Sequence, residues 1–187
     1  MTSQESAAAD LEQASERWLA WLAAETAGRQ EQQRLAEAAP AGGEQPQGLA
    51  ESAPARWPGP SASAPAETAG RWDPPGSALS VLWDALEEWF ASDDFAGSVL
   101  AAAVVAPPDG RGPAAHAVLV RHRQATRRLL EDLARSAGAP DPAALAGQLL
   151  TLVEGAMAGA LVDRHPGVAR HARELTRIAL AAAAARG

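Results

Sequence analysis

Apolar residues recur every three or four positions along most of residues 77–187, and this period predicts helices throughout that part of the chain. The clearest case is the segment 77–91, where the bulky apolar residues share one helical face. They are Leu79, Leu82, Trp83, Leu86, Trp89 and Phe90. No segment shows a competing strand pattern. We therefore predict an all-α helical bundle with short connections.

Proline, glycine and capping residues divide this part of the chain into five predicted helices. Their ranges are 77–91, 95–106, 113–137, 141–164 and 166–186. The turn Ser92-Asp93-Asp94 offers N-cap oxygens for the second helix, which Pro107-Pro108 end. Gly138 fits the position after the third helix, and Asp141-Pro142 cap and open the fourth.

Residues 1–39 predict a further amphipathic helix. Its apolar positions lie on one face and are Leu11, Ala14, Trp18, Trp21 and Leu22. The stripe fades after Glu25, so the amphipathic part has only about four turns, which are too few for a stable isolated helix. We therefore expect this helix to pack on another part of the protein.

Residues 40–76 are rich in Pro, Gly, Ala, Ser and Glu and nearly lack aliphatic residues. Such a segment buries too little apolar surface to offset its chain entropy, and this predicts a disordered linker before the main domain at 77–187. Trp57 and Trp72 interrupt the pattern. We expect these indoles to dock, on the protein's own domain in preference to a partner.

The charge distribution argues against a nucleic-acid-binding surface. The chain has a formal net charge of −7, and residues 1–76 hold 11 acidic residues against five arginines. Proteins that bind DNA or RNA need a basic face. The N-terminus lacks the apolar core of a signal peptide. The apolar segment 143–162 contains Gln148 and Glu154, so we predict a soluble, cytoplasmic protein without a membrane span.

Catalytic and metal-binding groups are not recognisable. Cysteine is absent, which excludes thiolate chemistry. His116 and His122 are six residues apart, as are His165 and His171, so neither pair shares a helical face as metal ligands would. No serine has a neighbouring histidine and acid. We predict no enzyme activity, no catalytic residue, no cofactor and no metal site.

Two polar residues fall on apolar stretches of predicted helices. His122 is interpreted either as a core histidine bonded to a backbone carbonyl or as a polar group that orients a ligand in an apolar cavity. Glu154 lies within LLTLVEGAMAGALV, where an unpaired buried carboxylate is costly. It is expected to pair with an arginine, face an interface, or bind a ligand.

The fourth predicted helix carries a ridge of small residues at four-residue intervals: Gly147, Thr151, Gly155 and Gly159. Such a ridge allows another helix to approach closely. The fifth helix adds an apolar face that includes Leu175 and Ile178. This surface exceeds the need of one small bundle, and it predicts a two-fold dimer of helix pairs.

The sequences of two segments resemble those of one protein family. DALEEWFASDDFAGSVLAAAVV, residues 84–105, resembles the start of the C-terminal domain of tetracycline-repressor-type (TetR/AcrR) transcriptional regulators, in which a Trp-Phe-like pair precedes "DF-x-G". Residues 121–180 are similar to the rest of that domain, including GAPDPAALAGQLL and the Glu-Gly-Ala step at 154–156. The resemblance covers residues 77–187.

The resemblance implies an α-helical domain that binds an effector and dimerises. Family members dimerise through their last two helices, which correspond here to residues 143–164 and 166–186. Matching positions give the residues expected to line the effector pocket, to which Glu154 is added from its own position. These candidates are Trp83, Leu86, Phe90, Leu100, Val104, His122, Glu154 and Met157.

The chain departs from the family at two places. Gly97-Ser98 stands where many relatives carry Gly-Cys, and residues 1–76 show no recognisable helix-turn-helix head. We therefore predict a regulator module that binds a small hydrophobic effector and forms a homodimer, or a heterodimer with a full-length TetR-type relative, without contacting nucleic acid itself. The alternative is a non-enzymatic interaction or scaffold protein that uses the tryptophan-containing helix and the linker.

Overall fold

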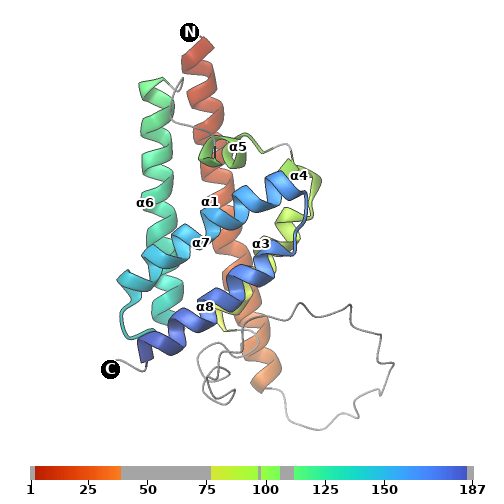
Figure 1. Cartoon of the computed structure of the whole chain (residues 1–187), viewed down its shortest axis with the longest axis vertical. Coiled ribbons are helices and arrows are strands. Elements are labelled where there is room, and N and C mark those ends of the chain that lie inside the picture. Colours follow the sequence, from red (N-terminus) through yellow and green to blue (C-terminus); the bar gives the residue numbers. More distant parts are fainter. Residues whose placement is uncertain (1–2, 39–76, 97, 106–111, 185–187) are drawn as a thin grey trace.

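The computed structural model describes residues 3–38, 77–96, 98–105 and 112–184. This part of the chain contains helices and no strand, which confirms the all-α prediction. The helices are α1 (Ser3–Ala38), α3 (Ala78–Phe90), α4 (Asp93–Ala96), α5 (Val99–Val105), α6 (Pro113–Ser136), α7 (Pro142–Asp163) and α8 (Val168–Ala184) (Figure 1). The predicted linker, with Trp57 and Trp72, lies outside the described residues.

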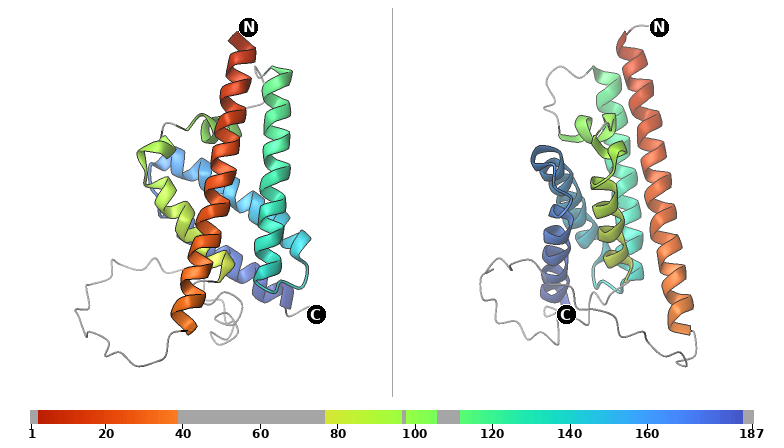
Figure 2. Two further views of the ribbon diagram at one scale, coloured as in Figure 1. Left: turned by 180° about the vertical axis from the view of Figure 1, so that it is seen from behind. Right: turned by 90° about the vertical axis from the view of Figure 1, so that its right-hand side faces the viewer.

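The helices are arranged in layers. α1 and α6 lie side by side and run in the same direction, whereas α7 and α8 form an antiparallel pair on the opposite side (Figures 1 and 2). α3 lies between α1 and α8 and contacts both, whereas α6 packs directly against α7. The short helix α5 contacts α1 and α7. The core is therefore enclosed by helices from both ends of the chain.

α1 belongs to the same hydrophobic core as the later helices. Leu11, Trp18 and Leu22 are buried in one cluster with residues such as Leu82 and Leu130. Burying a leucine-sized side chain contributes about 1.5–3 kcal/mol, which explains how a short amphipathic stripe is held in helical form. The expectation that this helix packs on another part of the protein is confirmed.

The single helix predicted over residues 95–106 is two helices, α4 and α5, and that prediction is corrected. Ser92 Oγ accepts a hydrogen bond from the Phe95 backbone N–H at 3.3 Å, and Ser98 Oγ accepts one from the Ala101 N–H at 3.2 Å. Each short helix therefore begins at its own serine. Asp93 and Asp94, predicted as caps, lie in the first turn of α4 instead.

The later helix boundaries follow the predicted signals closely. Gly138 ends α6 with φ of +73°, a left-handed conformation that glycine adopts without strain. Asp141 Oδ1 accepts a hydrogen bond from the Ala144 N–H at 3.0 Å and caps α7. α7 ends at Asp163, its C-cap residue Arg164 adopts φ of +51°, and α8 begins at Val168.

α7 has the length and composition of a helix that crosses a membrane, on those two criteria alone. Within its most apolar stretch of 18 residues, 44% is buried inside the structure. Leu149, Val153 and Met157 are among the residues that face the core. A central helix of a globular bundle has the same composition, because it is covered on several sides.

Polar contacts join α3 to the helices on either side. Trp83 Nε1 donates a hydrogen bond to Thr176 Oγ1 of α8 at 3.0 Å. Arg29 of α1 pairs with Glu88 at 2.5 Å, and this hydrogen-bonded guanidinium lowers the pKa of the Glu88 carboxyl. α3 is thus fixed to both outer layers by directional contacts as well as by apolar packing.

Candidate functional site

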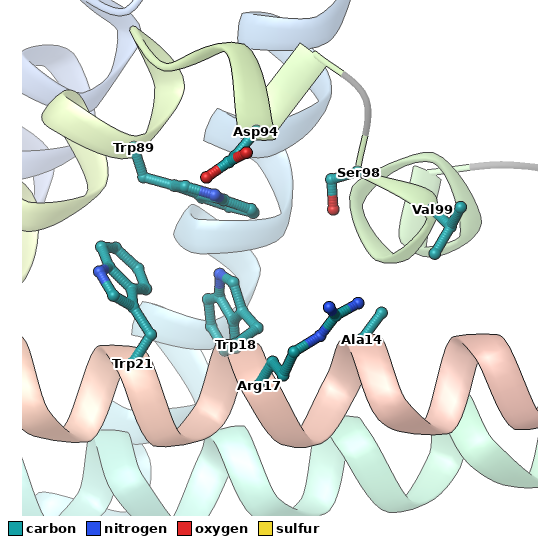
Figure 3. Close-up of a pocket in the computed structure, with 8 residues that line it drawn as sticks. All are labelled: Ala14, Arg17, Trp18, Trp21, Trp89, Asp94, Ser98 and Val99. Atoms are coloured by element: carbon teal, nitrogen blue, oxygen red, sulfur yellow. The ribbon is translucent and has the colours of Figure 1, made fainter.

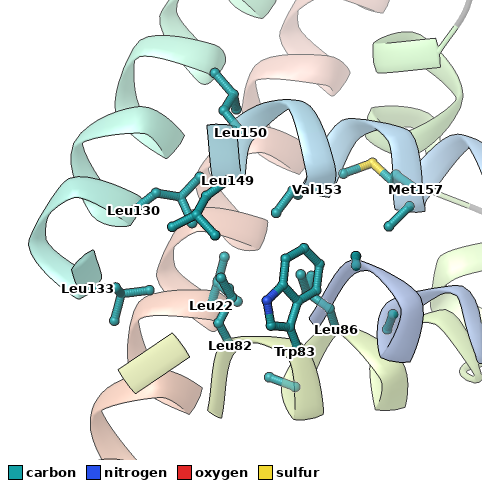
Figure 4. Packing of buried hydrophobic residues seen from close by; sticks show 14 of the residues in the cluster. Leu22, Leu82, Trp83, Leu86, Leu130, Leu133, Leu149, Leu150, Val153 and Met157 are labelled. Atoms are coloured by element: carbon teal, nitrogen blue, oxygen red, sulfur yellow. The ribbon is translucent and has the colours of Figure 1, made fainter. Parts of the chain in front are cut away.

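Except for Glu154, the residues predicted to line an effector pocket belong to a packed core. The buried members are Trp83, Leu86, Phe90, Leu100, His122 and Met157, and Val104 is half-buried. Figure 4 shows Trp83, Leu86 and Met157 among leucine and valine side chains from neighbouring helices. The hollow described below is lined by other residues.

His122 is held by hydroxyl groups from two helices. Its Nδ1 lies 3.0 Å from Ser15 Oγ of α1, and its Nε2 lies 3.4 Å from Thr126 Oγ1. The ring also packs edge-on against Trp18, with centroids 5.2 Å apart. Burial lowers the pKa of His122 to about 4, so the ring is neutral at neutral pH. Of the two interpretations of His122, the structure shows the core histidine. Its hydrogen-bond partner is a serine hydroxyl instead of the expected backbone carbonyl.

Glu154 lies at the boundary between α6 and α7. Its Oε1 is 2.6 Å from Arg123 Nε, and the two side chains are 25% and 56% exposed. Of the three expectations for Glu154, the structure contains the arginine pair. An ion pair this close to solvent contributes at most about 1 kcal/mol, so the contact positions α6 against α7 more than it stabilises the fold.

An open hollow of about 500 Å³ lies between α1 and the corner formed by α3, α4 and α5 (Figure 3). We call it the tryptophan hollow; its lining residues are Ala14, Arg17, Trp18, Trp21, Trp89, Asp94, Ser98 and Val99. Small-molecule sites in proteins typically measure about 300–1,000 Å³ and combine apolar walls with a few polar groups. The tryptophan hollow has both properties.

Two indoles of the tryptophan hollow, those of Trp18 and Trp21, pack against the third, that of Trp89. Its ring centroid lies 5.9 Å from that of Trp18 and 5.9 Å from that of Trp21, with tilted planes. Phe95 meets Trp89 edge-on at 4.8 Å. Each aromatic pair of this kind contributes about 0.5–1.5 kcal/mol beyond its buried area. The walls are therefore held in place before any ligand arrives.

Polar groups of both signs line the same hollow. Arg17 extends from α1 toward Ser98 and Val99, while Asp94 lies over Trp89 on the other wall (Figure 3). Arg17 takes part in none of the ion pairs found among the described residues. The hollow therefore presents a guanidinium group whose hydrogen-bonding capacity is available to a ligand.

One further donor at this site lacks a partner. The Nε1 of Trp18 is buried and forms no hydrogen bond within the described structure. Figure 3 shows this nitrogen on the side of the ring that faces Trp89. A buried polar group without a partner costs about 1–3 kcal/mol, and such groups are uncommon in folded proteins. This nitrogen is one of three such atoms among the described residues, with Gln30 Nε2 and Ser80 Oγ, and it belongs to a residue that lines the tryptophan hollow.

Sequence reasoning missed this site although it identified two of its walls. It placed Trp18 and Trp21 on the packing face of one helix and Trp89 on another, without connecting them. Arg17 received no role, and Asp94 was assigned only to capping. The available signal was the pair Trp18 and Trp21 on one helical face, together with Trp89 just before the Ser92-Asp93-Asp94 corner. Their meeting depends on how α1 docks, which pattern alone does not specify.

The predicted dimer residues of α7 lie in different surroundings. Thr151 and Gly155 are exposed, whereas Gly147 and Gly159 are half-buried. A Cβ atom at Gly155 would meet nothing within 4 Å, but one at Gly159 would lie 3.2 Å from Val168 Cγ2. Gly159 therefore serves the packing of α7 against the start of α8, and Gly155 opens to solvent.

The predicted dimer residues of α8 are exposed. The accessible fractions of Leu175 and Ile178 are 51% and 54%. They lie three residues apart and so share one helical face, on the side opposite to the buried Thr176 and Leu180. α8 thus presents an apolar stripe that no described residue covers.

The described residues contain no group of three or more histidine, cysteine, aspartate or glutamate side chains that would hold a metal ion. No protein-family model, curated protein or solved structure matches the chain. The geometry of its own surfaces is therefore the structural basis for a functional proposal.

Proposed function

We propose that the chain is a non-enzymatic regulatory module that binds a small, largely hydrophobic effector in the tryptophan hollow. The observation that carries this proposal is a hollow of about 500 Å³ in whose walls Trp18 and Trp21 each pack against Trp89. Preformed aromatic walls lose little entropy on binding, and the few polar groups beside them orient the ligand.

The module forms a two-fold dimer through α7 and α8. The exposed stripe of Leu175 and Ile178 and the open surface at Gly155 support this proposal. A glycine without neighbours lets a second helix pair approach the backbone of α7 closely. In a two-fold dimer the same patch serves both subunits, so these residues would meet their own copies or near neighbours.

The resemblance of residues 84–105 and 121–180 to TetR-type regulators supports a role in transcription rather than in transport or storage. The second subunit is another copy of this chain or a full-length TetR-type relative. In either case the chain acts in the cytoplasm, where effector binding changes the dimer that it forms. The chain does not itself contact DNA, because its net charge is −7.

A thermal-shift screen against hydrophobic small molecules tests effector binding. A ligand that binds only the folded state at 100 times its Kd stabilises it by about 2.7 kcal/mol. The Trp21→Ala variant should lose the shift because it removes a half-buried wall, whereas Leu35→Ala, exposed on the same helix, should keep it. A shift that survives Trp21→Ala would place the ligand elsewhere.

Light scattering tests the dimer. The double substitution Leu175→Glu and Ile178→Glu should convert the dimer to a monomer, because it places charges in the apolar stripe. Val120→Glu on α6 is the matched control, since Val120 is also exposed but lies outside the proposed interface. A wild-type monomer, or dissociation by the control alone, would contradict this interface.

The scaffold alternative is supported by one observation: Trp21 and Trp89 remain half-buried at the opening of the tryptophan hollow. Apolar side chains of a partner protein would fit the same walls. Under this alternative no compound raises the melting temperature, and a partner binds in a manner that Trp21→Ala abolishes. Ligand-dependent melting favours the effector-binding module instead.

A further inference from the structure

We infer that the tryptophan hollow selects a flat aromatic anion with a single negatively charged group. Its ring lies against the indole walls and its acidic oxygens are bound by Arg17. This inference rests on the proposed function, because it specifies the ligand of the same hollow. It follows from three properties of the lining: its shape, its excess of donors, and the position of its one carboxylate.

The walls favour a flat ring over a branched aliphatic ligand. Trp18, Trp21 and Trp89 present indole surfaces that are tilted by 38–56° relative to one another within two packed pairs. Aromatic rings bind such surfaces by offset stacking or by edge-to-face contact, which adds to the burial of apolar area. The small side chains of Ala14 and Val99 leave space beside the indoles.

The donors of the hollow outnumber its acceptors. Arg17 offers the hydrogen-bonding fork of a guanidinium group that is free of described ion pairs. Trp18 Nε1–H is buried without a partner. Ser98 Oγ accepts from the Ala101 N–H at 3.2 Å, and its own hydrogen remains available to a ligand. Ligand oxygens that only accept hydrogen bonds satisfy the accessible donors of Arg17 and Ser98.

Arg17 determines the charge of the ligand. A guanidinium group binds a carboxylate, sulfonate or phosphate through paired, charge-assisted hydrogen bonds, which are about twice as strong as neutral ones. A cationic ligand would stack on the indoles but would face the Arg17 charge at the same opening. The guanidinium therefore favours an anion over a cation.

Asp94 limits the ligand to one negative group. Its carboxylate lies over Trp89, on the wall across from Arg17 (Figure 3). A second anionic group at the far end of a ligand would meet this like charge. A ring with one acidic substituent avoids the repulsion. Arg17 therefore selects the sign of the ligand's charge, and Asp94 limits the number of its charged groups.

Two fluorescent probes that differ by one sulfonate test this inference on the full-length chain. They are 8-anilinonaphthalene-1-sulfonate and its neutral counterpart N-phenyl-1-naphthylamine, which share the same rings. Titrations followed by energy transfer from the tryptophans give a Kd for each probe. Each variant is compared with wild type for one probe at a time, so the different hydrophobicities of the probes do not affect the result.

Arg17→Gln should weaken the sulfonate about tenfold, the equivalent of 1.4 kcal/mol, and leave the neutral probe within about twofold. Asp94→Asn should tighten the sulfonate because it removes a like charge. Both residues are exposed, so neither variant should alter the fold. Arg128→Gln, a substitution of an exposed arginine on α6, should change neither affinity.

The outcomes separate this inference from the proposed function. If both probes bind and Trp21→Ala weakens both, but Arg17→Gln weakens them equally or not at all, the hollow binds ligands without selecting anions and the inference is wrong. If neither probe binds, or Trp21→Ala has no effect on either, the hollow is not a ligand site and the proposed function fails with it. Weaker sulfonate binding by Asp94→Asn would also overturn the charge assignment.

Discussion

The indole N–H of Trp83 donates a hydrogen bond of 3.0 Å to the hydroxyl of Thr176, and both residues are almost completely buried. The Thr176 hydroxyl in turn donates to the Ala172 carbonyl at 2.9 Å. This chain of polar contacts crosses the core between α3 and α8. Trp83 was expected to line an effector pocket, but its indole N–H is hydrogen-bonded within the protein.

Thr176→Val should destabilise the fold by about 1–3 kcal/mol, because valine keeps the shape but leaves the Trp83 N–H without an acceptor. Chemical denaturation gives the free energy of unfolding. Ser136→Ala is the control, since the Ser136 hydroxyl also bonds the carbonyl four residues earlier but is exposed on α6, outside the proposed interface. Equal effects at both positions would mean that the Trp83 contact adds no stability.

Leu22→Ala should lower the free energy of unfolding by about 2–5 kcal/mol, because Leu22 has no exposed surface and its truncation leaves a cavity in the shared core. Leu35→Ala, later on the same helix, should change it by less than about 0.5 kcal/mol, because Leu35 is exposed. Urea unfolding measures both. Similar small losses would show that α1 does not contribute to the cooperative core.

His122 should make stability fall with decreasing pH. Burial lowers its pKa in the folded state to about 4, against about 6.5 in the unfolded chain. The unfolded state therefore binds more protons between these values, so stability is fully present above pH 6.5 and is lost as pH falls toward 4. The expected loss is about 2–4 kcal/mol.

Urea unfolding of His122→Gln across the same pH range isolates this effect from the carboxylates. The difference in stability between wild type and the variant should shrink as pH falls. His116→Gln, an exposed residue on the same helix, should follow the wild-type curve. If His122→Gln runs parallel to wild type at every pH, the histidine is not buried in its neutral form.

Gly155→Ala should raise the stability of the monomer and weaken the dimer. A Cβ at Gly155 meets nothing within 4 Å, so the substitution gains about 1 kcal/mol of helix propensity. The same methyl group would enter the proposed dimer interface and hold the second subunit away. Gly28→Ala, also without neighbours within 4 Å but on α1, should raise stability alone. Unchanged dimer affinity in Gly155→Ala would place the interface elsewhere.

The helical periodicity of the sequence predicted most of the fold. The predicted ranges of α3, α6 and α7 agree with the structure to within one or two residues, because α3 and α6 have strong apolar faces and Gly138 and Asp141 mark the end of α6 and the start of α7. The corner after α3 was less predictable. Ser92 and Ser98 each start a short helix there, and local hydrogen bonds of that kind leave no periodic pattern.

The candidate site was harder to predict than the fold. His122 and Glu154 each drew attention as polar residues on apolar stretches, but their partners are Ser15 and Arg123, on helices whose contacts the pattern did not define. The indoles of the tryptophan hollow were individually apparent. Which of them meet depends on the angle and register with which α1 crosses α3, and those follow from packing of the whole core.

The pairing of α1 with α6 also has a consequence for synthesis of the chain. Ser15 and His122 are 107 residues apart and bond to each other in the finished protein. At about 5–20 residues per second, α1 leaves the ribosome many seconds before its neighbour exists. Throughout that interval Trp18 and Leu22 lack their final cover. The most aromatic part of the N-terminal helix is thus made early and buried late.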